Sequence, residues 1–147
     1  MSAGAVRPHL PTDEELRQIL RMTNTIAVVG LSSKPERPSN EVAVYLQREG
    51  YRIVPINPNE REVLGETAYP SLDDVPKDVR IDMVDVFRRA EETPPIAEAA
   101  VRVGARVLWL QLDIVNEEAR RIAERGGLTV VMGACIKIEK RRFEGEG

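Results

Sequence analysis

The chain has 147 residues, of which 42% are hydrophobic and 31% charged, and its net charge is −3. This size and balance predict a single domain, residues 1–147, with one core. The lack of a basic surplus and an aromatic content of only 4% argue against nucleic-acid binding. No apolar run approaches the roughly twenty residues that a membrane span needs, and the N-terminal segment lacks the apolar stretch of a signal peptide. We therefore expect a cytoplasmic protein that does not contact a membrane.

Cysteine and histidine each occur once, as Cys135 and His9. A single cysteine excludes an internal disulfide, and one residue of each type cannot build a structural zinc site. We expect His9 to lie in an unstructured leader, residues 1–11, which also argues against a Cys–His nucleophile pair. No metal site is expected.

The first third of the chain alternates between helical and extended patterns. Thr12 and Glu15 have the spacing of a capping box, which predicts an N-terminal helix. Ser39 is placed to cap a second helix and Gly50 to end it. In chain order, this part is predicted as a helix at 12–22, a strand at 25–29, a helix at 39–50 and a strand at 51–57.

A long connection follows, and then the alternation resumes. Residues 58–80 are long for a loop, and we expect a short edge strand near Val63–Leu64 and a helical turn around Leu72–Val75 within them. Thr93 and Asn116 are placed to cap the two later helices. The remainder is predicted as strands at 81–87, 105–113 and 128–132 that alternate with helices at 93–104 and 116–127.

Strands that alternate with helices in this way predict an α/β fold with a parallel sheet covered on both faces. We expect a Rossmann-like, doubly wound sheet in three layers. The long connection after the second strand is a natural place for the winding to reverse, which predicts a main-strand order of 2-1-3-4-5. Ligands of such sheets bind outside the carboxyl ends of the strands, at the point of reversal.

The loop after the first strand has the features of a phosphate site. Gly30 permits a turn in which a side chain would conflict with the backbone. Ser32 and Ser33 precede a helix, where hydroxyls and backbone N–H groups suit phosphate, and Lys34 and Arg37 add positive charge. The loop lacks both the G-K-[ST] of a Walker loop and the further glycines of a dinucleotide fingerprint. The alternative is a plain strand-to-helix turn with exposed basic residues.

The second strand ends in Asn57–Pro58, where an NAD site usually has Asp or Glu. This difference, together with the missing glycines, makes NAD(P) binding a minor alternative. Asn57 and Pro58 either contact a ligand or simply form a turn.

The ends of the third and fourth strands carry further candidates. Phe87 either closes the core or faces the cleft, and Arg88 either pairs with phosphate or is solvated. Trp109 and Gln111 share one face of their strand. A Trp in a central strand usually packs in the core, whereas Gln111 near the strand end is placed to hydrogen-bond a ligand amide.

Catalytic groups are not visible in the sequence. Asp82 and Asp85 lie three apart on a predicted strand, so their side chains fall on opposite faces and do not form an acid–base pair. A Ser/His/Asp set cannot be assembled, because the only histidine lies in the predicted leader. The residues therefore favour a phosphate-binding cleft without catalytic machinery.

Five segments, 28–46, 50–76, 81–89, 104–114 and 130–139, together resemble the small stand-alone CoA-binding proteins. They are also similar to the Rossmann-type N-terminal domain of the succinyl-CoA synthetase α-subunit, and the resemblance runs from about residue 25 to 139. It implies a CoA site: CoA phosphates at Gly30, Ser32, Ser33, Lys34 and Arg37, the nucleotide at Asn57 and Pro58, and a border formed by Val86, Phe87, Arg88, Trp109 and Gln111.

The chain departs from the proteins that it resembles in three respects and agrees with them at its cysteine. It lacks the second domain in which the synthetase carries its phosphorylated histidine. Asp113 stands where the family often has glycine, and Gly133–Ala134 where it often has Asp-Arg. Cys135 falls on a family cysteine position, as a small buried residue or as a thiol that pairs with CoA.

Three functions follow as hypotheses. The first is a binding module that holds CoA or an acyl-CoA without converting it. The second is the CoA-binding subunit of an acyl-CoA synthetase-like enzyme that another chain completes. The third is an NAD(P)-binding regulator.

Overall fold

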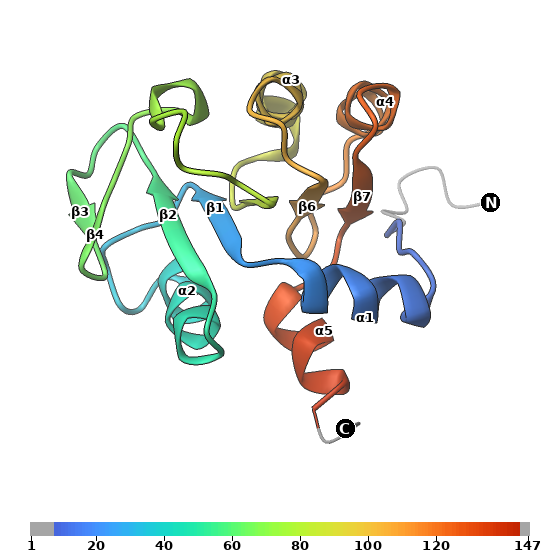
Figure 1. The fold of residues 1–147 in the computed structure, drawn as a ribbon, viewed down its shortest axis with the longest axis horizontal. Coiled ribbons are helices and arrows are strands. Elements are labelled where there is room, and N and C mark those ends of the chain that lie inside the picture. Colours follow the sequence, from blue (N-terminus) through green and yellow to red (C-terminus); the bar gives the residue numbers. More distant parts are fainter. Residues whose placement is uncertain (1–7, 145–147) are drawn as a thin grey trace.

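Five parallel strands form the centre of the molecule (Figure 1). The computed structural model describes residues 8–144. Across the sheet the strands are β2 (Arg52–Ile56), β1 (Thr25–Val29), β5 (Met83–Val86), β6 (Val107–Leu110) and β7 (Thr129–Met132). The predicted order is confirmed, since these are the second, first, third, fourth and fifth main strands of the chain.

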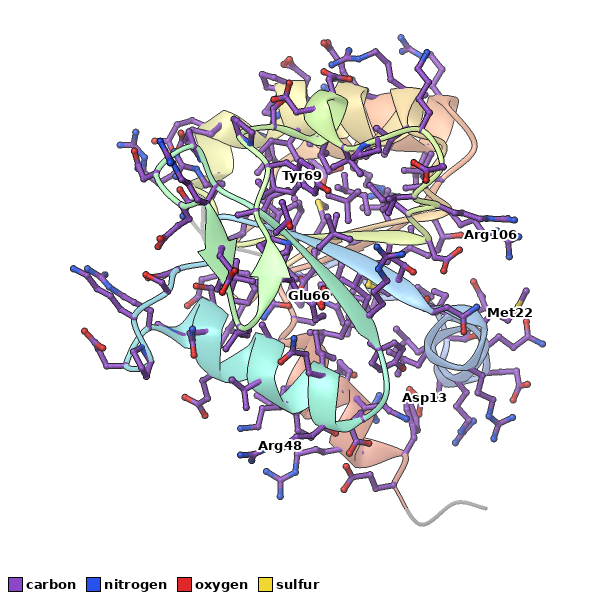
Figure 2. All side chains as sticks on the ribbon, turned by 60° about the vertical axis from the view of Figure 1, so that its left-hand side comes forward. Asp13, Met22, Arg48, Glu66, Tyr69 and Arg106 are labelled. Atoms are coloured by element: carbon purple, nitrogen blue, oxygen red, sulfur yellow. The ribbon has the colours of Figure 1, made fainter. Side chains whose placement is uncertain are left out.

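Helices cover both faces of this sheet, as Figures 1 and 2 show. On one face lie α3 (Thr93–Arg102) and α4 (Glu117–Arg125), and on the other α1 (Asp13–Met22), α2 (Pro38–Arg48) and α5 (Ile136–Arg142). Each face has its own apolar core, because successive strand residues point to opposite sides. The result is the three-layer, doubly wound fold expected from the sequence.

Helix starts follow the sequence in two cases and differ in two. Thr12 Oγ1 accepts a hydrogen bond from Glu15 N at 3.2 Å, and Asn116 caps α4, as predicted. Ser39 does not cap α2, because Pro38 opens that helix and places Ser39 inside its first turn. Thr93 likewise lies within α3 rather than at its cap.

The long connection contains a small hairpin and a short 3₁₀ helix, and a second 3₁₀ helix follows β5. β3 (Glu62–Val63) pairs in antiparallel fashion with β4 (Glu66–Thr67), so the expected short strand is present but pairs outside the parallel sheet. The expected helical turn is η1 (Leu72–Asp74), and η2 (Ala90–Glu92) precedes α3.

His9 pairs with the open edge of the outer strand β7 at Met132. His9 and Met132 exchange backbone hydrogen bonds of 3.0 and 2.9 Å. The expectation that His9 belongs to an unstructured leader is therefore wrong, because the exposed edge of β7 offers it unpaired backbone groups. Residues 1–7 of the expected leader lie outside the described residues. No helix among the described residues has both the length and the apolar character to cross a membrane.

Candidate functional site

A large cleft lies at the carboxyl edge of the sheet, where the winding reverses. We call it the main cleft, and its volume is about 870 Å³. Ligand sites in proteins commonly span about 300–1,000 Å³. Its lining comes from the loops after all five parallel strands and from α2 and α5: Gly30, Ser32, Lys34, Arg37, Pro38, Ser39, Val42, Asn57, Asn59, Glu60, Phe87, Arg88, Arg89, Gln111, Leu112, Asp113, Ile114, Cys135 and Ile138.

Gly30 is required at the start of the first loop for two separate reasons. Its φ is +87°, a conformation that side chains disfavour. A Cβ at this position would also lie 2.7 Å from the backbone oxygen of Phe87. The Gly30 N–H meanwhile donates to the carbonyl of Ile56 at 2.8 Å, which ties the loop to the end of β2.

Hydrogen bonds from neighbouring elements hold the rest of this loop. Ser32 N donates to Ser39 Oγ at 3.0 Å, and Asn40 Nδ2 donates to the Ser32 carbonyl at 2.9 Å. Asn57 Nδ2 donates to the carbonyl of Leu31 at 3.0 Å. The loop is thus fixed from both α2 and β2, and a ligand would meet a preformed surface.

The Glu60 carboxylate accepts a hydrogen bond from one backbone N–H of the loop. Ser33 N donates to Glu60 Oε2 at 2.9 Å, and hydrogen bonds from Ser33 hold the pKa of this carboxyl below its usual range. The exposed cations Lys34 and Arg37 line the cleft beside it. An anion is therefore already stabilised at the place where the sequence predicts phosphate.

Gln111 presents an unused donor to the main cleft. Its side chain is only 4% exposed, and its Oε1 accepts a hydrogen bond from Ile136 N at 3.2 Å. Within residues 8–144, its Nε2 has no hydrogen-bond partner. This nitrogen is not fully buried, so it is free to donate a hydrogen bond to a ligand carbonyl in the cleft.

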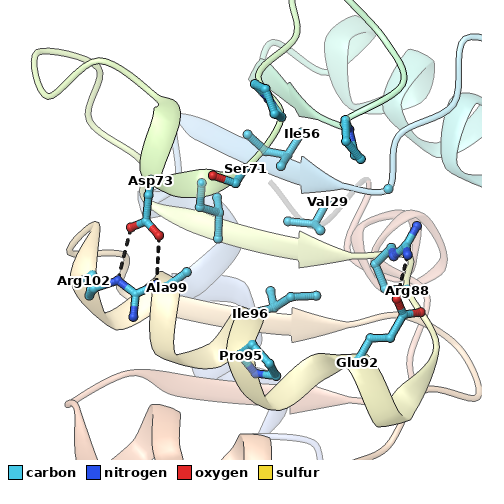
Figure 3. Close-up of a pocket in the computed structure, with 14 residues that line it drawn as sticks. Val29, Ile56, Ser71, Asp73, Arg88, Glu92, Pro95, Ile96, Ala99 and Arg102 are labelled. Atoms are coloured by element: carbon cyan, nitrogen blue, oxygen red, sulfur yellow. Dashed lines mark hydrogen bonds and ion pairs between the residues drawn. The ribbon is translucent and has the colours of Figure 1, made fainter.

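A second, smaller cavity opens on the α3 side of the sheet (Figure 3). We call it the side cavity; its volume is about 380 Å³, and Gly30 and Arg88 border both it and the main cleft. Val29, Ile56 and Ile96 give it apolar walls. At its ends lie two ion pairs, Arg102 with Asp73 at 2.8 Å and Arg88 with Glu92 at 2.6 Å.

The structure brings most of the sequence-predicted residues together. The main cleft is lined by Gly30, Ser32, Lys34, Arg37, Asn57, Phe87, Arg88 and Gln111, and the side cavity by Pro58. Ser33 belongs to the loop but its amide faces Glu60. Val86 and Trp109 line neither cavity: both are fully buried, and the Trp109 indole N–H donates to the carbonyl of Ala134 at 2.8 Å.

Sequence reasoning missed Glu60, Leu112 and Ile138. Glu60 lies beyond the Asn57–Pro58 turn, and Ile138 lies on α5 (Ile136–Arg142), a helix that the sequence patterns do not predict. Their sequence spacing from Gly30 carries no signal, because a cleft assembled from several loops is visible only after folding.

Asp85 is a buried acid without a role in the cleft lining. Neither carboxylate oxygen has a hydrogen-bond partner among residues 8–144, and burial raises the pKa of this carboxyl well above its usual range. Within the described part of the chain, no cluster of acidic, His and Cys side chains suited to a metal ion is found.

The sequence model of the CoA binding domain matches residues 24–141. The chain belongs to this CoA-binding family. A relative from Bacillus subtilis, the uncharacterized protein YneT, is 44% identical over 128 residues, which are 87% of this chain and 93% of the relative. A solved structure of a hypothetical protein from Pyrococcus horikoshii is 41% identical, with a TM-score of 0.89, and the match covers 96% of this chain and 99% of that one.

More distant relatives of this chain include much longer ligase subunits. The α-subunit of an ADP-forming acetate–CoA ligase from Pyrococcus furiosus is 28% identical over 123 residues. The match covers 77% of this chain but only 27% of that subunit. The shared part is therefore one segment of a much longer protein.

Proposed function

We propose that this protein binds CoA or an acyl-CoA, with the phosphates held by the loop after β1. The observation that carries the proposal is the preformed loop itself: Gly30 turns it, Ser32 is fixed from α2, and Lys34 and Arg37 line the adjoining cleft. Membership in the CoA-binding family supports CoA over other phosphate-containing ligands.

The two cavities fit the two ends of CoA. The side cavity has apolar walls between ion pairs and adjoins both Gly30 and Pro58, which suits the flat adenine ring. The main cleft would take the pantetheine arm, whose amide carbonyls match the unused Nε2 donor of Gln111. Both arms of the ligand would then diverge from the phosphates at Gly30.

Binding without conversion is the function that we favour. The lining of the main cleft includes neither a histidine nor a paired acid and base that would support acyl or phosphoryl transfer. A second candidate, a CoA-binding subunit completed by another chain, is supported by the similarity to the acetate–CoA ligase α-subunit. Co-purification of a partner chain with nucleotide-dependent ligase activity would favour this second candidate.

Isothermal titration with CoA, dephospho-CoA and NAD tests the proposal. We expect CoA to bind and NAD to bind much more weakly. The double variant K34E/R37E should weaken CoA binding by about tenfold or more at low salt, because hydrogen bonds to charged groups contribute about 1.5–3 kcal/mol. The control R48E/R52E reverses two exposed charges outside both cavities and should leave the affinity unchanged. Absence of CoA binding by the unaltered protein would refute the proposal.

A further inference from the structure

The main cleft has a charged end and an apolar end. Its four cations, Lys34, Arg37, Arg88 and Arg89, come from the loops after β1 and β5. The loop after β6 and helix α5 contribute aliphatic side chains and no Lys or Arg to the lining. β1 and β6 are two strand spacings apart in the sheet, about 10 Å. A ligand with phosphates at Gly30 must therefore extend about this far to reach the apolar end.

Two exposed aliphatic side chains converge on the apolar end. Leu112 and Ile138 are 55% and 54% exposed, although they come from different elements. Single exposed hydrophobic residues are common on protein surfaces. Here both line one cavity together with Ile114 and the half-buried Cys135, so an apolar group bound there would remove their surface from water.

An acid in the same lining lies between Leu112 and Ile114 in the chain. Asp113 has a φ of +68°, in the left-handed region that non-glycine residues rarely adopt. No hydrogen bond or ion pair engages its carboxylate within the part of the chain that the structure describes. An unpaired carboxylate here repels a second negative charge and has little effect on a neutral group.

We propose that the apolar end receives the acyl group of a CoA thioester and that Asp113 restricts it to uncharged aliphatic acyl groups. The inference rests on the proposed CoA binding and names its ligand class. The cations hold the phosphates, Gln111 binds the arm, and the thioester end reaches Leu112 and Ile138. A dicarboxylic acyl group would bring its terminal carboxylate against Asp113.

Three ligands of matched chemistry test this inference: CoA, butyryl-CoA and succinyl-CoA, titrated into the full chain at low salt. The two acyl groups have four carbons each and differ in the terminal carboxylate. We expect butyryl-CoA to bind at least tenfold more tightly than CoA, since each buried methylene contributes about fourfold. Succinyl-CoA should bind at least about fivefold more weakly than butyryl-CoA, because of repulsion by Asp113.

Variants separate the two parts of the inference. D113N should raise the affinity for succinyl-CoA toward that for butyryl-CoA, and L112S/I138S should abolish the gain of butyryl-CoA over CoA. The control M22S alters an exposed methionine outside both cavities and should change neither ratio. If CoA binds but the three ligands have equal affinities, the inference is wrong and the proposed function stands. If no ligand binds, both are wrong.

Discussion

The close approach of Gly30 to the end of β5 can be tested with a matched pair of glycine substitutions. G30A adds one methyl group at a φ of +87°, where its Cβ would lie 2.7 Å from the Phe87 oxygen. G127A adds the same group at a φ of +89°, where no atom of the described residues lies within 4 Å of the Cβ apart from its chain neighbours. Because the two φ angles are nearly equal, the difference between the variants reports mainly the steric contact.

The expected magnitudes follow from these geometries. A left-handed alanine costs about 1–2 kcal/mol, and this is the whole effect expected for G127A. Crowding inside a well-packed region costs a further 1–3 kcal/mol or so. The contact with Phe87 is hard to relieve, because a backbone carbonyl cannot rotate away and Phe87 N is bonded to the Val29 carbonyl at 2.8 Å. G30A should therefore lose about 2–5 kcal/mol of unfolding free energy.

Urea unfolding and CoA titration together give the readout. G30A should unfold at clearly lower urea than G127A, and only G30A should weaken CoA binding, because only Gly30 shapes the loop. Equal unfolding free energies for the two variants would show that the approach of Gly30 to Phe87 is not tight, and our account of the loop would fail.

Three further predictions concern single side chains. E60Q should raise the affinity for CoA, because the Glu60 carboxylate that competes for the Ser33 N–H loses its charge. E62Q alters a residue outside both cavities and is the control. Weaker CoA binding by E60Q than by the unaltered protein would contradict this competition. For Asp85, the buried carboxyl keeps its proton at pH values where the unfolded chain has lost it, so wild-type stability should fall relative to D85N as pH rises above about 4. The fall should be up to about 1.4 kcal/mol per pH unit, and parallel urea-unfolding stabilities across pH 4–7 would refute it. W109F should lower the free energy of unfolding by about 1–3 kcal/mol, because the buried carbonyl of Ala134 loses its hydrogen-bond donor. The affinity for CoA should not change.

The main sheet could be predicted from sequence because its signals are local. Buried parallel strands appear as short branched apolar runs, and the long segment between Ile56 and Met83 marks the reversal of winding. Helix starts were less predictable where a proline competes with a capping side chain. Pro38 fixes the first helical residue of α2, so Ser39 loses its capping role and instead holds the loop amide of Ser32.

Helix α5 shows what local patterns could not predict. It has seven residues, most of them charged, so its sequence has little intrinsic reason to fold alone. Its stability comes from partners that are distant in sequence. Its first residue, Ile136, is fully buried in the core, and Arg142 forms an ion pair at 2.9 Å with Asp13, near the other end of the chain. Because α5 supplies Ile138 to the main cleft, the apolar end of the site could not be predicted without this helix.

The strand ends explain which candidate residues reach the cleft. Side-chain alternation predicts that Trp109 and Gln111 lie on one face of the strand, but it does not show which of the two reaches the cleft. Their positions relative to the end of β6 do separate them: Trp109 lies within the strand, opposite Asp85 and Val131, whereas Gln111 is the first residue beyond it. The same holds for β1, β2 and β5, whose first following residues Gly30, Asn57 and Phe87 all line the cleft. Within a strand, side chains are enclosed by the helical layers; one residue later the backbone leaves the sheet, and the side chain becomes available to a ligand. Strand boundaries, which sequence patterns define least well, are therefore what decide the site in this fold.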